Sequence, residues 1–117
     1  MPSQSGAAAH GPIDLDHLRE MTMSDSALER EVLRLFVEQT ANMMRALASL
    51  PDDAAALAHT LKGSARAIGA FRVAEAATAL EAALHEQGGA REVFARLEAE
   101  VGAARQAAAM LLAQPKS

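Results

Sequence analysis

Residues 54–84 read AAALAHTLKGSARAIGAFRVAEAATALEAAL and predict two helices joined by a very short turn. Alanine and leucine fill most of this stretch, and both favour helix strongly. On each side of Gly69 the apolar residues recur every three to four positions, which is the spacing of a buried helix face. The two predicted buried faces are Ala54, Ala58, Leu61, Ala65 and Ile68, and Val73, Ala77, Leu80 and Leu84. Gly69 would end the first helix, and Phe71 would begin the second.

The segment before this hairpin predicts two further helices. A short helix would run from Ile13 to about Met21, with two aspartates in its first turn, where they complement the helix dipole. The run Ser26-Ala27-Leu28-Glu29 has the spacing of a capping box and would begin a longer helix. Its predicted inward positions are Val32, Leu35, Phe36, Gln39, Met43, Ala46, Leu47 and Leu50, with Gln39 as a polar residue at the rim.

The residues that flank the hairpin mark where its own helices begin and end. Pro51 fits the first turn of the helix that contains His59, and Asp52 and Asp53 follow it directly in the sequence. Gln87-Gly88-Gly89 would end the second helix of the hairpin. A last helix would run from about Ala90 to Ala113, with inward residues Phe94, Leu97, Val101, Ala104, Ala108 and Leu111.

Four long helices with short connections predict an all-α fold. We expect an antiparallel up-down four-helix bundle, with the short extra N-terminal helix covering one end. Residues 13–114 would form this domain, and residues 1–12, which are rich in Ser, Gly, Ala and Pro, would be a disordered leader. A length of 117 residues fits one domain with a single core.

The composition limits the classes of function. The formal net charge is −4 and there is no basic run, so we expect no nucleic-acid partner, because phosphate neutralisation needs a basic face. The chain has no cysteine, which excludes disulfides and thiolate metal sites. No apolar stretch approaches the roughly 20 residues that span a bilayer, and the first residues do not resemble a secretory signal. We therefore expect no membrane association and a cytoplasmic location.

The hairpin contains the run His59-Thr60-Leu61-Lys62-Gly63-Ser64-Ala65. Helical residues three and four apart share a face, so Lys62 and Gly63 would flank the imidazole. This arrangement suits a histidine that accepts a phosphoryl group, because the lysine can balance new negative charge and the glycine lets another protein approach the ring. A side chain at position 63 would lean back over His59, since helical side chains tilt toward the N-terminus. The alternative is a solvated histidine without a functional role.

The short turn also predicts which residue faces His59. With the turn centred near residue 70, position 59 lies opposite positions 80 and 81. Leu80 belongs to the predicted core, so Glu81 is the candidate to accept a hydrogen bond from Nδ1–H of His59. That bond would select one tautomer and leave the Nε2 lone pair facing solvent. The alternative is a surface carboxylate that pairs with Lys62 or with water.

The segment from His59 through Lys62-Gly63-Ser64-Ala65 to Gly69 and Phe71, continued by Leu80-Glu81, resembles histidine-containing phosphotransfer (HPt) domains. The resemblance covers roughly residues 13–110, and the His-x-x-Lys-Gly-Ser core is its most specific part. It implies a four-helix bundle with His59 as the phosphoacceptor. It also implies that Lys62 balances charge, that Gly63 gives access, and that Glu81 bonds the imidazole.

The resemblance further implies a function and partners. Such a protein shuttles a phosphoryl group between the receiver-domain aspartates of a hybrid kinase and a response regulator, here through a phosphohistidine at His59. Mg²⁺ would lie in the acidic pocket of the receiver, and the chain itself would need no metal or cofactor. We expect a phosphoryl carrier rather than an enzyme, because the chain has no glycine-rich nucleotide motif and hence no ATP site or autokinase activity. We also expect a monomer, since one bundle can bury its own apolar faces.

Two other functions fit the same helices. One is the phosphoacceptor module of a chemotaxis-type kinase, and the other is a purely structural helical interaction bundle. Thr60 argues against the dimerising histidine domain of sensor kinases, in which an acidic residue follows the histidine. A metal-binding bundle is not expected, because His10, His17, His59 and His85 lack helical i, i+3 or i+4 spacing and no Glu-x-x-His pairs occur.

Overall fold

The computed structural model describes residues 11–86 and 88–115. Within these residues it contains five helices: α2 (Leu15–Met21), α3 (Ser26–Leu47), α4 (Ala54–Ile68), α5 (Phe71–Glu86) and α6 (Ala90–Ala113). No strand occurs in this part of the chain, so the predicted all-α fold is confirmed. Most of the predicted leader, residues 1–10, lies outside the described residues.

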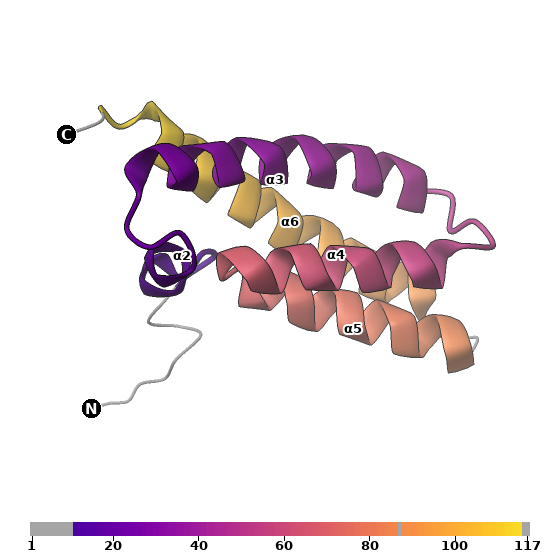
Figure 1. The fold of residues 1–117 in the computed structure, drawn as a ribbon. Helices are drawn as coiled ribbons and strands as arrows, with labels where there is room; N and C mark the ends of the chain where they lie inside the picture. Colours follow the sequence, from indigo (N-terminus) through magenta and orange to yellow (C-terminus); the bar gives the residue numbers. More distant parts are fainter. Residues whose placement is uncertain (1–10, 87, 116–117) are drawn as a thin grey trace.

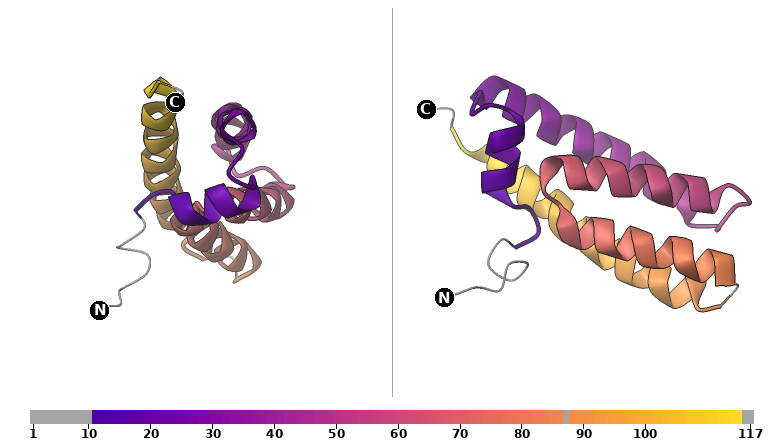
Figure 2. Two further views of the ribbon diagram at one scale, coloured as in Figure 1. Left: turned by 60° about the vertical axis from the view of Figure 1, so that its left-hand side comes forward. Right: turned by 60° about the horizontal axis from the view of Figure 1, so that its bottom comes forward.

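The four long helices surround a common core (Figure 1). The chain passes along α3, returns along α4 and repeats this path along α5 and α6, so successive long helices run in opposite directions. Helix α3 packs against α4 and α6, and α5 packs against the same two helices. The short helix α2 lies across one end of the bundle, where it packs against α4 (Figure 2).

The residues that begin helices α2, α3 and α4 differ in part from those that the sequence predicts. Asp14 and Asp25 precede α2 and α3, and each side chain accepts a hydrogen bond of 3.1 Å from the backbone three residues on. Asp25 therefore caps α3, and the capping box predicted to start at Ser26 is wrong by one residue. The prediction for Pro51 is also wrong, because α4 begins only at Ala54, after a turn in which the Ala54 N–H donates to the Pro51 carbonyl.

Gly69 determines how α4 and α5 meet. Its φ of +84° is a left-handed conformation that glycine adopts readily because it has no Cβ. The N–H groups of Gly69 and Ala70 donate to the carbonyls of Arg66 and Ala65, which closes the end of α4. The Asp14 N–H donates to the Gly69 carbonyl at 2.9 Å, and a Cβ on residue 69 would lie 2.8 Å from the Asp14 carbonyl oxygen. This turn therefore determines the register of the hairpin and the position of α2.

The predicted core of the hairpin and of α6 is confirmed almost residue for residue. The buried predicted positions are Ala54, Ala58, Leu61, Ala65, Ile68, Val73, Ala77, Leu80, Phe94, Leu97, Val101, Ala104 and Ala108. Leu84 and Leu111 are partly buried against them. Most of the buried positions in α4 and α5 are alanines, so the two helices of the hairpin can approach closely.

The predicted inward face of α3 is partly wrong. Its buried residues are Leu33, Phe36, Thr40 and Leu47, whereas the predicted inward residues Leu35 and Ala46 are exposed. Gln39, predicted at the rim, is exposed as well. Two neighbouring stripes of α3 fit the helical period, and the chain buries the one that contains a threonine. Burial of Thr40 is possible because its hydroxyl donates to the Phe36 carbonyl at 2.7 Å. Because this stripe faces the core, Leu35 on the other stripe is left 44% exposed.

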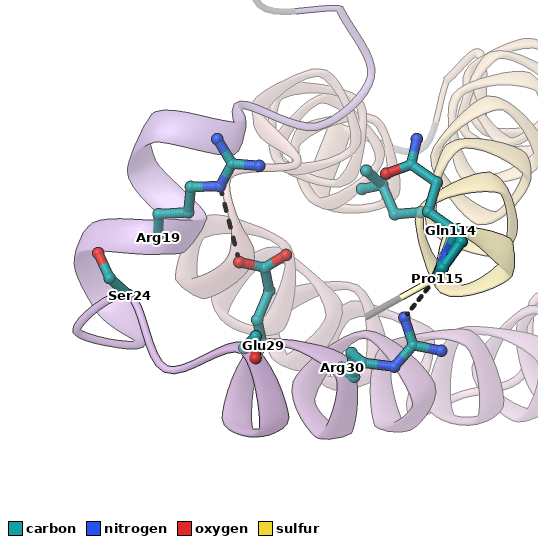
Figure 3. Close-up of a pocket in the computed structure, with 8 residues that line it drawn as sticks. Arg19, Ser24, Glu29, Arg30, Gln114 and Pro115 are labelled. Carbon is teal, nitrogen blue, oxygen red and sulfur yellow. Dashed lines mark hydrogen bonds and ion pairs between the residues drawn. The ribbon is translucent and has the colours of Figure 1, made fainter. Parts of the chain in front are cut away.

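A pocket at one end of the bundle joins α2, α3 and the C-terminal end of α6 (Figure 3). There Nε of Arg19 lies 3.8 Å from Oε1 of Glu29. The guanidinium of Arg30 donates to the carbonyls of Leu112 at 2.6 Å and Gln114 at 3.2 Å, which satisfies acceptors that a helix end leaves free. None of the residues that line this pocket belongs to the α4–α5 hairpin, so it is separate from the residues around His59.

Candidate functional site

His59 projects from the middle of α4 into solvent. Its side chain is 68% exposed, although the residues on either side of it in sequence, Ala58 and Thr60, differ in exposure because they face in different directions. The ring is not stacked on another aromatic side chain within the described residues. Its Nδ1 atom lies 3.3 Å from Oε2 of Glu81 on α5. The hairpin register thus produces the contact that the sequence predicts.

Glu81 bridges His59 and Lys62. Its second carboxylate oxygen, Oε1, lies 3.0 Å from Nζ of Lys62. The two partners of this ion pair are 20% and 18% exposed, so the pair is partly shielded from water. The two alternatives predicted for Glu81, a hydrogen bond from His59 and an ion pair with Lys62, therefore occur together, one at each carboxylate oxygen. Lys62 is only partly exposed beside the imidazole, because its side chain turns toward α5 to reach the carboxylate.

The ion pair with Lys62 stabilises the ionised form of Glu81. Burial alone would raise the pKa of the Glu81 carboxyl, but the hydrogen bond and charge of Lys62, together with the His59 contact, hold this pKa below its ordinary value. An ionised carboxylate can only accept hydrogen bonds. The contact therefore favours the tautomer of the neutral imidazole that carries its hydrogen on Nδ1 and donates it to Glu81, which leaves the Nε2 lone pair free.

The side of His59 that faces away from α5 is formed by small residues. Gly63 is exposed, and a Cβ built on it would meet no atom within 4 Å apart from the backbone of its own helix. Ala56, Thr60 and Ala67 are also exposed, and the Thr60 hydroxyl donates to the Ala56 carbonyl one turn back on the same helix. A flat surface beside the ring results, over which another protein can approach Nε2 closely.

A shallow groove between α3 and α4 extends this flat surface. It is lined by Val32, Leu35, Phe36, Gln39, Ser64, Ala67 and Ile68. The sequence pattern misses this feature, because it predicts Leu35 in the core. The signal that could have revealed it is the pair of competing stripes on α3, only one of which can face the bundle.

The other described histidines lie elsewhere. His17 packs edge-on against Phe71, with ring centroids 5.1 Å apart, and its Nε2 atom is buried. His85 is exposed near the C-terminal end of α5, and His10 lies outside the described residues. Across residues 11–86 and 88–115, no three His, Cys, Asp or Glu side chains are grouped so that they could hold a metal ion. None of the described helices is long and apolar enough to cross a bilayer.

The sequence profile of the Hpt domain matches residues 31–110 of the chain. This segment includes all of α4 and α5 and most of α3 and α6. It therefore contains the four residues His59, Lys62, Gly63 and Glu81. The chain belongs to the Hpt domain family. Hpt domains are phosphocarrier modules of two-component signalling that interact with receiver domains in phosphorelays. No curated protein and no solved structure shows significant similarity to the chain.

Membership of this family decides between the broad alternatives. An Hpt domain is a phosphotransfer module, so family membership favours this class of function over that of a purely structural helical bundle. The predicted resemblance over residues 13–110 is confirmed for residues 31–110. The α2 segment lies outside the matched range, although it packs on the end of α4 through Asp14.

Proposed function

We propose that this Hpt domain carries a phosphoryl group on His59 and passes it between the receiver-domain aspartates of a hybrid kinase and a response regulator. The observation that supports this most strongly is the contact between Nδ1 of His59 and the ionised Glu81, which leaves Nε2 free on an exposed ring. A nucleophile of this kind needs an available lone pair, a selected tautomer and room for its partner. The Glu81 contact supports the first two for His59, and Gly63, which leaves the adjacent surface open, supports the third.

The proposed transfer is a substitution at phosphorus. The Nε2 lone pair of neutral His59 attacks the phosphorus of a receiver phosphoaspartate, in line with the departing carboxylate. A P–N bond forms, the P–O bond breaks, and the aspartate carboxylate leaves with the electron pair. The imidazole then carries positive charge while Nδ1–H still donates to the Glu81 carboxylate, which stabilises the charge that develops on the ring. Transfer to the second receiver reverses these steps.

Lys62 supports this chemistry in the proposal by stabilising the ionised form of Glu81, which accepts the hydrogen bond from Nδ1–H. A protonated Glu81 would bring a donor rather than an acceptor toward Nδ1, and the selection of the tautomer would be lost. The ammonium of Lys62 also adds positive charge one turn from His59, where it favours the arriving phosphoryl group. Mg²⁺ would be supplied by the acidic pocket of the receiver, because oxygen ligands from carboxylates are what this ion prefers.

The proposal includes the form in which the protein works. One α4–α5 hairpin supplies every residue of the site, so we propose that the chain acts as a monomer. We propose that it binds no nucleotide, has no autokinase activity and works in the cytoplasm, where it meets receiver domains. The related alternative is the phosphoacceptor module of a chemotaxis-type kinase, which would receive its phosphoryl group from ATP bound to a kinase domain.

A panel experiment tests this function. Receiver domains phosphorylated with a labelled small donor are incubated with the parent chain, His59→Gln and the matched control His85→Gln, which changes an exposed histidine on α5. We expect acid-labile label on the parent and on His85→Gln, and none on His59→Gln. Failure of every receiver to label the parent, together with labelling by an ATP-loaded kinase domain, would support the chemotaxis-type alternative. Label on His59→Gln would place the phosphoacceptor elsewhere.

A further inference from the structure

Arg66 lies on the same side of α4 as His59 and is not used by the fold. It follows His59 by seven residues, which is two helical turns or about 10 Å along the axis. Its side chain is exposed, and no carboxylate among the described residues lies within ion-pairing distance of its guanidinium. Lys62, the other cation near His59, is already paired with Glu81. Arg66 is therefore the cation of this face that remains available to a partner.

The groove beside Arg66 continues the α4–α5 seam that holds the Lys62–Glu81 pair. It is lined by Arg66, Phe71, Ala74, Glu75 and Thr78. Thr78 precedes Glu81 by one turn of α5, and its hydroxyl donates to the Ala74 carbonyl, so it does not compete for the guanidinium. Glu75 is exposed in the same groove but does not form an ion pair with Arg66. A partner docked over His59 would meet Arg66 at the edge of its footprint.

Charge along α4 is distributed unevenly on the two sides of His59. Asp52 and Asp53 are exposed at the N-terminal end of the helix, and the side chain of Asp53 does not cap it. Arg66 lies at the opposite end, near the turn at Gly69. An acidic partner surface is repelled by the two aspartates at the first end, whereas at the second end the guanidinium of Arg66 is available to bind a carboxylate next to Glu75. At physiological ionic strength the Debye length is about 8 Å, so these charges act locally on a partner in contact with the helix.

We propose that Arg66 is a specificity-determining contact for the receiver domain, and that it binds a carboxylate at the rim of the receiver's acidic pocket. This inference rests on the proposed function, because it assumes that a receiver docks over His59. The planar guanidinium of arginine binds a carboxylate through two parallel hydrogen bonds, which gives direction as well as attraction. With aspartates at the other end of α4, this contact orients the receiver so that its aspartate faces Nε2.

The test compares two charge reversals, Arg66→Glu and Arg96→Glu. Arg96 is exposed on α6, outside the α4–α5 hairpin, and each change lowers the formal net charge by two, from −4 to −6. Transfer is measured from the panel receiver that labels the parent fastest, as a function of receiver concentration and of NaCl. We expect Arg66→Glu to raise the half-saturating receiver concentration at least tenfold at low salt, with little change in the maximal rate. Arg96→Glu should change it less than twofold.

Salt provides the second measurement. At about 1 M NaCl the Debye length falls to about 3 Å, so the parent and Arg66→Glu should converge to within about twofold. Labelling by phosphoramidate, a small donor that needs no docking, should be equal in the parent and both variants. Equal losses in the two variants would show a mere net-charge effect, and no loss in Arg66→Glu would reject the contact. A parent that labels with phosphoramidate but exchanges with no receiver would instead reject the proposed function on which the contact depends.

Discussion

Gly63→Leu should block transfer from receivers while making the domain more stable. The parent leaves open space at this position, since a Cβ on residue 63 would meet no atom within 4 Å apart from the backbone of its own helix. Residue 63 is exposed, so the rest of the leucine can extend into solvent, and the substitution removes a glycine that weakens helix α4 by about 1 kcal/mol relative to alanine. We expect the melting temperature to rise by a few degrees.

The loss of transfer follows from the distance that the reaction requires. The receiver must bring its phosphorus to about 3–3.5 Å from Nε2 of His59, and a displacement of about 1 Å costs roughly 10²-fold in rate. Carbon atoms of two surfaces pack no closer than about 3.5–4 Å, so a leucine that leans over the ring displaces the partner by more than 1 Å. We therefore expect the rate to fall at least 10²-fold, which corresponds to about 2.7 kcal/mol in the barrier.

Gly102→Leu is the matched control. Gly102 also lies within a helix, is exposed and has open space at its Cβ position, but it belongs to α6. Its substitution should raise the melting temperature similarly and leave transfer at the parent rate. Stopped-flow or gel-based transfer from one labelled receiver measures both variants. Transfer by Gly63→Leu at the parent rate would refute the access role, and unfolding of this variant would refute the assignment of residue 63 to the open face.

Three further substitutions test the residues around His59. Glu81→Ala should redistribute the ring hydrogen of His59 between its two nitrogens. Transfer should slow by about 2- to 10-fold, because a partly exposed charge-assisted hydrogen bond is lost. Unchanged ¹⁵N chemical shifts of the imidazole ring would contradict this role of Glu81. Lys62→Met should raise the pKa of Glu81. Because the parent pKa is depressed, the stability that Lys62 adds should be complete at pH 7 and disappear as the pH falls through that pKa, which urea unfolding of both proteins can measure. Gly69→Ala should destabilise by about 1–3 kcal/mol, since its φ is +84° and its Cβ would press on the Asp14 carbonyl; an unchanged urea midpoint would contradict that geometry.

The hairpin could be predicted in detail from sequence because its signals agree with one another. Alanine and leucine favour helix, their spacing marks one buried face on each helix, and Gly69 ends α4 where a left-handed residue is needed. A two-residue turn leaves little freedom in register, so Glu81 could be predicted to face His59. The position of the candidate site therefore followed from local rules alone.

Helix α3 could not be predicted equally well, because two of its stripes satisfy the same period. The chain buries Thr40, whose hydroxyl bonds to its own helix, and leaves Leu35 exposed beside the groove next to α4. Packing against the neighbouring helices decides which of the two stripes is buried. The periodicity of α3 alone does not specify that packing. An exposed leucine in the groove between α3 and α4 suits the docking of a partner better than it suits the stability of the isolated fold.

Lys62 is the second case in which tertiary structure changed the interpretation. Spacing places it on the face of His59, but its long side chain can turn by several ångströms, and the Glu81 carboxylate on α5 attracts it. This ion pair stabilises the ionised form of the carboxylate that contacts Nδ1 of His59. A sequence pattern can assign a residue to a helix face, but it cannot show which partner a flexible charged side chain selects.

The most direct test of the central claim is to identify the atom that carries the phosphoryl group. The chain is labelled with ¹⁵N-histidine, phosphorylated by a receiver domain and examined by ¹⁵N and ³¹P NMR. We predict one-bond coupling between phosphorus and Nε2 of His59, with hydrogen retained on Nδ1 next to Glu81, and loss of the signal in His59→Gln. Phosphorus bonded to Nδ1 of His59, or to His17 or His85, would contradict the account.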